Sequence, residues 1–413
     1  MKRMSGTLAA ACLLLMATVV KAEEWKAFRV KPTVAAVQPM TGLVLWSDSE
    51  HAATAPIQLE FCYLPYSAVM KGPESYDWTA VDRQLAAVAK RKHQAILRFW
   101  DTYPAKPSGV PAYIRNSPGW RGKTADSEGE ATGFPDWGNA AWQEAHLAFF
   151  KAFAARYDKD PRLAFLQCGF GLWSEYHIYD GPFESGLTFP DRAYQARFLN
   201  HMAACFKQTH WMISIDAADA EIGPFLQDKK LKSLPFGLFD DSFLAKEHPK
   251  VNAPRWKFFG ADRWQTSPGG GELSYYNDRD QREALSKKGP NGESLESASA
   301  RFHTSFMIGN DQPQYADMAR IGQVGRAMGY RFRLDSAKRS AKAVKLTFSN
   351  TGVAPIYYDA YPAYAGAEAK TSLKGLLPGQ KRTVVIPTKV KNGNVTIRST
   401  RLVPGQKIGF SVK

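Results

Sequence analysis

Short apolar runs alternate with amphipathic segments from Thr41 to about Met328, which limits the chain to few folds. Such alternation is typical of α/β proteins, in which strands and helices follow each other along the chain. Seven apolar runs (42–46, 57–63, 95–100, 163–166, 211–216, 236–243 and 304–308) read as strands, and a further strand region begins in 255–264 and continues toward Gly269. Eight strands over roughly 290 residues predict a (β/α)8 barrel, with a doubly wound sheet as the alternative, because periodicity does not show closure.

Helical spacing of apolar residues fills the intervals between these strands. Val81, Leu85 and Val88 recur at helical spacing, and so do the aromatic residues between Trp142 and Tyr157. Residues 193–206 and 315–328 are expected to form further helices. The long polar segment 102–139 between strands three and four is expected to be functional, because loops of that length are uncommon inside compact domains. It carries Trp120, Phe134 and Trp137, which are candidates for stacking on sugar rings.

The pattern changes after Gly329. Short alternating stretches at 330–334, 344–348, 383–386 and 395–397 are separated by turn residues. Such stretches predict an all-β sandwich. We therefore expect a barrel over residues 23–329 and a β-sandwich over residues 330–413, with the sandwich acting as a brace rather than as a carbohydrate module, since it lacks a dense pattern of exposed aromatic residues.

The chain begins with the features of a secretory signal peptide. Lys2 and Arg3 precede an apolar run from Leu8 to Val20, and a small residue, Ala22, ends a cleavage site. About 13 apolar residues are too few for a transmembrane helix. Residues 1–22 therefore predict export, to the periplasm or the medium, and no later segment is apolar enough to span a membrane.

Charge and cysteine content narrow the choice of partner. The net charge is +15, but the basic residues are scattered rather than clustered. Nucleic acid is a conceivable partner of a basic chain, yet export favours a carbohydrate, which could be an anionic polysaccharide, or a negatively charged envelope surface. A generally basic solvated surface is the simpler explanation. The three cysteines after the signal peptide have no spacing typical of zinc or of a disulfide framework, and no motif for a metal or nucleotide cofactor is present.

Two glutamates are the main candidates for catalysis. Glu175 follows the fourth apolar strand, at the kind of position where barrels carry catalytic groups. Glu272 follows three glycines, which allow the backbone to approach a ligand closely. Glycoside hydrolysis uses two carboxyl groups across the scissile bond. Asp240 and Asp241 at the end of strand six are the rival pair, and only one of them can face the site because adjacent strand residues point to opposite faces.

Other residues could bind or orient a substrate. Arg98 ends strand three and could orient a carboxylate through a charge-assisted hydrogen bond. His177 could bind substrate or tune Glu175, although a lone histidine is more often structural. Trp100, Trp173 and Trp264 are candidate platforms for sugar rings, and each could equally belong to the core. Asp241 could hydrogen-bond sugar hydroxyls.

The segments YDWTAVDRQL, AILRFW, GFGLWSEYH and GGGEL, followed by GYRFRL and LTFSNTGVAP, resemble a group of secreted bacterial barrel proteins. These are assigned as glycoside hydrolases with an appended β-sandwich domain of unknown function. The barrel is also similar to the clan A retaining glycosidases. That resemblance implies that Glu175 is the acid/base and Glu272 the nucleophile. Ser174 stands where the clan has asparagine.

Two functions therefore remain open from the sequence. One is an exported glycoside hydrolase, with retention of configuration, that acts on a poly- or oligosaccharide. The other is a non-catalytic glycan-binding or cell-envelope protein built on the same scaffold. The aromatic residues of segment 102–139 would serve either function.

Overall fold

The computed structural model describes residues 24–34 and 37–413. The predicted signal peptide, residues 1–22, lies outside the described residues. Within them, every helix is too short or too polar to span a bilayer.

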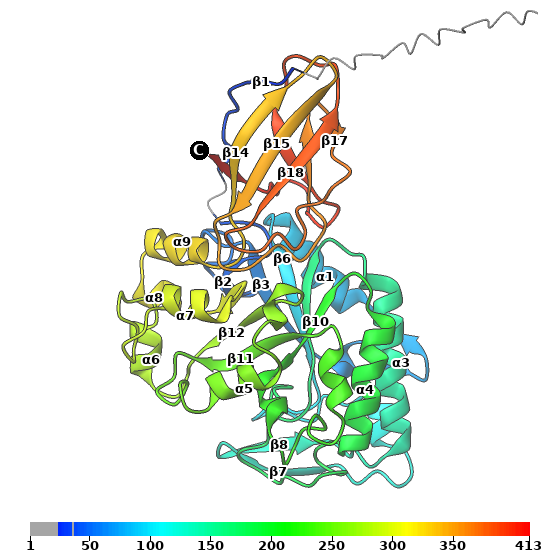
Figure 1. Ribbon diagram of the computed structural model, residues 1–413. Coiled ribbons are helices and arrows are strands. Elements are labelled where there is room, and N and C mark those ends of the chain that lie inside the picture. The colour runs from blue at the N-terminus through cyan, green and yellow to red at the C-terminus, as the bar shows by residue number, and fades with distance from the viewer. Residues whose placement is uncertain (1–23, 35–36) are drawn as a thin grey trace, which may run out of the picture.

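Eight parallel strands close into a barrel, as the sequence predicts (Figure 1). In chain order they are β2 (Gly42–Trp46), β3 (Leu59–Pro65), β6 (Gln94–Trp100), β9 (Leu163–Gln167), β10 (His210–Ser214), β11 (Gly237–Phe243), β12 (Gly269–Leu273) and β13 (Phe306–Ile308). Pairing of β13 with β2 completes the circle, which excludes the doubly wound sheet. Apolar side chains from at least six of the strands fill the interior, among them Phe61, Ile96, Phe165, Phe239 and Phe306.

Helices cover the outside of the barrel. They are α1 (Thr79–Lys90), α2 (Ala112–Arg115), α3 (Ala140–Tyr157), α4 (Arg192–Cys205), α5 (Asn252–Phe258), α6 (Asp278–Glu283), α7 (Leu295–Phe302), α8 (Gln312–Tyr315) and α9 (Met318–Ala327). The loops contain two antiparallel strand pairs: β4 (Met70–Gly72) with β5 (Ser75–Tyr76), and β7 (Lys123–Ser127) with β8 (Glu130–Phe134). The predicted functional loop 102–139 thus contains helix α2 and the β7–β8 hairpin.

The start of the seventh strand was predicted too early. Residues 255–264 lie mostly in α5 and in the 3-10 helix Arg263–Gln265, and strand β12 begins at Gly269. Glycine has low strand propensity, so the aromatic run read as the stronger strand. The glycines are required by packing, because a Cβ at Gly270 would overlap the Phe306 ring and one at Gly271 would overlap the carbonyl of Asp240.

Two sheets around one apolar core follow the barrel, which confirms the predicted β-sandwich. One sheet holds β14 (Phe332–Arg339), β15 (Ala343–Asn350), β18 (Lys381–Pro387) and β20 (Phe410–Val412), and the other β16 (Tyr361–Tyr364), β17 (Ala367–Glu368) and β19 (Val395–Arg398). The pairs are antiparallel except for β14 with β20. The first described strand, β1 (Lys26–Ala27), also pairs with β14 and so joins this sandwich.

The sandwich docks on the end of the barrel where the strands begin (Figure 1). Tyr358 packs in the barrel interior with its ring centroid 6.2 Å from that of Phe165, and its hydroxyl donates to the Ala164 carbonyl. The buried Arg401 donates to the carbonyls of Asp158 and Leu163. The opposite end of the barrel, where the strands end, is therefore the open one.

Candidate active site

A cavity of about 500 Å³ lies at the open end of the barrel. Barrel enzymes place their active sites at this end of the strands. The cavity brings together five of the predicted site residues: Arg98, Trp173, Glu175, Asp241 and Glu272. Its remaining lining consists of Trp46, Phe61, Tyr63, Tyr103, Glu128, Tyr179, Tyr275, Tyr276, Asn310 and Asp311.

The loop after β9 holds Glu175 in a tightly folded backbone. Trp173, Ser174 and Tyr176 all have left-handed φ angles of 52°, 61° and 64°, which is costly for residues with side chains. The loop folds back so closely that a Cβ at Gly169 would overlap the Ser174 carbonyl. The Ser174 hydroxyl, fully buried, donates to the Phe99 carbonyl at 2.7 Å. Ser174 therefore anchors the loop and does not reach the cavity.

Arg98 fixes one oxygen of Glu175. Its Nη1 donates to Glu175 Oε1 and, at 3.1 Å, to the Trp173 carbonyl, while Nε and Nη2 donate to Gln167 Oε1 at 3.0 and 2.6 Å. The guanidinium also lies 4.5 Å from the centre of the Phe239 ring. Although burial opposes its charge, the Glu175 carboxylate raises the pKa of Arg98. The ion pair with Arg98 therefore orients the Glu175 carboxylate.

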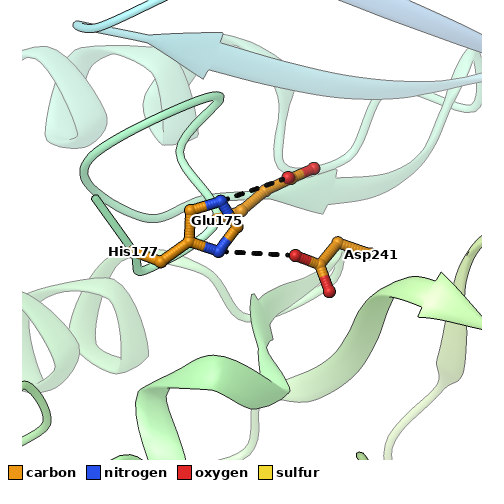
Figure 2. A group of neighbouring side chains, drawn as sticks. All are labelled: Glu175, His177 and Asp241. Atoms are coloured by element: carbon orange, nitrogen blue, oxygen red, sulfur yellow. Dashed lines mark ion pairs between the residues drawn. The ribbon is translucent and has the colours of Figure 1, made fainter. Parts of the chain in front are cut away.

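His177 lies among three carboxyl groups, two of which, those of Glu175 and Asp241, are drawn in Figure 2. Its Nδ1 lies 3.0 Å from Asp216 Oδ2 and 3.4 Å from Asp241 Oδ2, and its Nε2 lies 4.0 Å from Glu175 Oε2. Burial opposes the charge of this ring, but the hydrogen bond with Asp216 and the charges of Asp241, Asp216 and Glu175 raise the pKa of His177 to about 9. An imidazolium among carboxylates fits this arrangement.

The same cluster has the composition of a metal site, because ligand atoms of Glu175, His177 and Asp241 lie within 4.8 Å of one another. A metal would need the neutral imidazole. Asp216 binds Nδ1 and leaves Nε2 without a hydrogen-bond partner among the described residues, while Arg98 already binds one oxygen of Glu175. A cation at this cluster would therefore have to displace the proton of His177.

Asp240 and Asp241 point to opposite sides of strand β11, as the sequence predicts. Asp240 is fully buried in the wall, where it accepts from His248 Nε2 at 3.0 Å, Trp256 Nε1 at 2.8 Å and Asn252 Nδ2 at 2.6 Å. Asp241 instead lines the cavity. Burial, then the charges of Asp216 and Glu175, raise the pKa of Asp241.

Glu272 faces the same cavity without a hydrogen bond or ion pair to any of the described residues. Glu272 lies on β12, which pairs with β11, the strand of Asp241. Asp240 of β11 is paired with Gly271 of β12, so the next residues, Asp241 and Glu272, are neighbours across the two strands. Burial, then the negative charge of Glu175, raise the pKa of Glu272 to about 8. The raised pKa favours the protonated form of Glu272 near neutral pH.

Two predicted platforms lie away from the cavity. Trp264 stacks on His303 with ring centroids 3.6 Å apart, and its carbonyl accepts from Tyr357 Oη of the sandwich. It lines a separate cavity of about 200 Å³ between α5 and α7. Trp100 is buried behind Tyr103, with ring centroids 5.4 Å apart.

The long loop contributes a residue other than its predicted aromatic groups. Phe134 and Trp137 are buried in the core, where Trp137 Nε1 donates to Asp101 at 3.0 Å, and Trp120 packs against the same core. The β7–β8 hairpin supplies Glu128, which accepts from the Tyr179 hydroxyl at the cavity rim.

Several residues in or beside the cavity were not singled out from the sequence. Tyr63 lies near the end of β3 and donates its hydroxyl to the Trp173 carbonyl. Asp216 follows β10, lines an adjacent cavity and pairs with Arg255 as well as with His177. Tyr275 and Tyr276 follow Glu272 after two residues. Each of them stands at or just after the end of a barrel strand, so the position that identified Glu175 applies to them too.

No protein-family model and no curated protein matches the sequence. Solved structures with a similar barrel include the catalytic domain of β-amylase from Paenibacillus polymyxa, with a TM-score of 0.44 and 9% identity over 70% of this chain and 98% of that chain. A mutant of xylanase A from P. fluorescens subsp. cellulosa in complex with xylopentaose has a TM-score of 0.42 and 9% identity over 65% of this chain and 85% of its own. A family 39 glycoside hydrolase from the gut symbiont Bacteroides cellulosilyticus has a TM-score of 0.43 and 12% identity over 86% of this chain and 83% of that chain. The likeness to these structures is distant and is one of fold; what the cavity can do follows from its own residues.

Proposed function

We propose that this protein is a glycoside hydrolase that cleaves a poly- or oligosaccharide in the cavity at the open end of the barrel. The proposal is based on one observation: Glu175 and Glu272 line the same cavity in different electrostatic environments. Glu175 has a cationic partner, Arg98, whereas Glu272 has none and a raised pKa. Glycosidases need one carboxyl group that stays protonated and one that stays charged. Aromatic side chains at the cavity wall, including Trp46, Tyr103 and Trp173, offer apolar faces to sugar rings.

The electrostatics favour roles opposite to those that the family resemblance implies. Glu272 has no ionic partner and a pKa of about 8, so it suits the proton donor. Glu175 is paired with Arg98, so it suits the charged nucleophile. We therefore assign Glu272 as acid/base and Glu175 as nucleophile, with Trp173 and Asp241 in substrate binding and Arg98 and His177 in positioning the carboxylates.

The reaction would take two steps. Glu175 attacks the anomeric carbon, and the bond from that carbon to the leaving oxygen breaks as Glu272 gives its proton to that oxygen. A water molecule then attacks the glycosyl ester, Glu272 takes up its proton, and Glu175 leaves as a carboxylate. Two inversions give net retention of configuration.

Substrates with different leaving groups test these roles. A Glu272→Gln variant is expected to lose kcat/KM on natural glycans but to keep most of its kcat/KM on dinitrophenyl glycosides, whose leaving group needs no proton in the first step. Its kcat on those substrates is expected to fall, because the second step loses its base. A Glu175→Gln variant is expected to lose activity on both. Glu144→Gln, an exposed glutamate on α3 paired with Arg197, is the matched control. The product anomer, read by NMR, tests retention.

The opposite pattern between the two variants would return the acid/base role to Glu175. Loss on both substrates in Asp241→Asn, with Glu272→Gln fully active, would make Asp241 the second catalytic carboxyl. A native protein that binds glycans but cleaves none of a broad panel would refute the hydrolase and favour a glycan-binding protein.

We also infer export from residues 1–22. The mass of the protein recovered outside the cytoplasm tests this inference, since cleavage after Ala22 is expected.

A further inference from the structure

We propose that the glycan bound in this cavity carries free, protonated amino groups, as in an oligosaccharide of amino sugars without N-acyl groups. This inference rests on the proposed function, because it names the substrate class of the same cavity. It departs from the expectation, based on the net charge of the chain, that an anionic polysaccharide could be the substrate.

The cavity is acidic although the chain is basic. Five carboxyl groups line it, from Glu128, Glu175, Asp241, Glu272 and Asp311, against one basic side chain, that of Arg98. The net charge of the whole chain is +15. The acidity is therefore a local property of the wall.

Arg98 is not available to bind an anionic sugar. Its guanidinium already donates to Glu175, Gln167 and the Trp173 carbonyl, and it is 2% exposed. A uronate or sulfate in the cavity would face carboxylates without a free cation among the described lining residues. Unpaired like charges in a partly enclosed cavity oppose binding.

The chemistry of hydrolysis uses two of the five carboxyls, which leaves Glu128, Asp241 and Asp311. Glu128 accepts from the Tyr179 hydroxyl, and Asp311 accepts from the Asn310 amide at 3.4 Å. Both donors are neutral, so neither carboxyl group has a charged partner among the described residues. Asp241 has one charged partner, His177, which it shares with Asp216 and Glu175.

Asp241 is the best position for an ammonium group. It lines the catalytic cavity and also a second cavity, of about 410 Å³, together with Tyr179 and Tyr276. The sugar chain could continue through this junction. The carboxyl groups of Asp216 and Glu175 share His177 with Asp241, so a cation placed there would stabilise the charged form of Asp241. The exposed ring of Tyr276 can add a cation–π contact.

Binding, measured apart from turnover, tests the inference. Calorimetry on the Glu272→Gln variant would compare hexasaccharides of glucosamine and of galactosamine, each in α-1,4, β-1,4 and β-1,6 linkage, with the N-acetylated, neutral and uronate hexamers of the same linkages. At least one free-amine hexamer is expected to bind tenfold or more tightly than its N-acetylated and neutral counterparts. That advantage should shrink as the salt concentration rises.

Variants locate the effect. Adding Asp241→Asn is expected to remove most of the amine advantage while the neutral hexamers bind as before, and Asp311→Asn is expected to reduce it partly. Glu144→Gln, which removes a charge outside the cavity, should leave it unchanged.

Three outcomes would overturn the inference. They are equal affinity for amine and N-acetylated hexamers, tighter binding of the uronate hexamer, and no binding of any free-amine hexamer. Tight binding of calcium alone that Asp241→Asn abolishes would assign the carboxylates to a metal instead. Cleavage of neutral glycans could still be present in each case, so these outcomes do not refute the hydrolase.

Discussion

Replacing Arg98 with methionine removes the counter-ion of Glu175 and keeps a long apolar side chain in its place. The side chains of Arg98 and Glu175 are 3% and 8% exposed, so the carboxylate would be left buried and unpaired. Removing one partner of a buried ion pair costs about 3–5 kcal/mol. We expect the free energy of unfolding of Arg98→Met to fall by about that amount at pH 8.

The loss should depend on pH in a defined direction. Without Arg98, the buried carboxyl of Glu175 becomes easier to protonate in the folded protein than in the unfolded chain. The folded variant then binds one more proton, so its stability falls as the pH rises. The deficit relative to the native protein is therefore expected to be smaller at pH 5 than at pH 8.

The coupling free energy between the two side chains is measured by urea unfolding of four proteins: the native protein, Arg98→Met, Glu175→Gln and the double variant. The double variant is expected to recover at least half of the loss of Arg98→Met, because no buried charge remains. Lys123→Met and Glu184→Gln form a control cycle on an ion pair that is 38% and 49% exposed, with an expected coupling below about 1 kcal/mol. Equal coupling in the two cycles, or a deficit independent of pH, would refute the reasoning.

Further variants test other parts of the molecule. The kcat/KM of the native protein is expected to fall about tenfold per pH unit above about 8, as Glu272 loses the proton it must donate; a rate that rises through this range would contradict the donor role. Tyr358→Phe should cost about 1–3 kcal/mol of stability, because the buried Ala164 carbonyl loses its donor, while KM stays unchanged at the far end of the barrel. Ser174→Asn, which introduces the residue of the clan A glycosidases, should destabilise the protein by about 1–3 kcal/mol and lower activity, because the Ser174 side chain fills a closed space; higher activity would show that the loop can open.

The order of strands was predictable because seven of the eight are apolar runs, as buried parallel strands are. Strand β12 was misplaced because its packing requires glycine, which is otherwise rare in strands. Gly270 and Gly271 leave room for the Phe306 ring and for the β11 backbone. The pairing of Lys26 with Arg339 was not predictable either. Nothing local to a two-residue strand indicates a partner about three hundred residues away.

Position after a predicted strand identified the carboxyl groups of the cavity, whereas the choice of large aromatic residues identified only some of its rings. Glu175, Asp241 and Glu272 all reach the cavity from positions at the ends of strands. Trp100 and Trp264 were chosen as large rings near strand ends, but tryptophan is equally suited to the core. Trp264 is held by His303 and by the sandwich, which no sequence pattern near it reveals.

The backbone around Glu175 gives a physical reason to regard this loop as built for function. Left-handed conformations at Trp173, Ser174 and Tyr176 each cost of order 1 kcal/mol or more. They persist because the Trp173 carbonyl accepts hydrogen bonds from Arg98 and Tyr63, and because the Ser174 hydroxyl donates a hydrogen bond to the Phe99 carbonyl. The groups that hold the strained backbone thus include Arg98, which also orients the Glu175 carboxylate. A loop that only closed the barrel could relax by using glycine at these three positions, whereas this one retains the strain and fixes a carboxylate in the cavity.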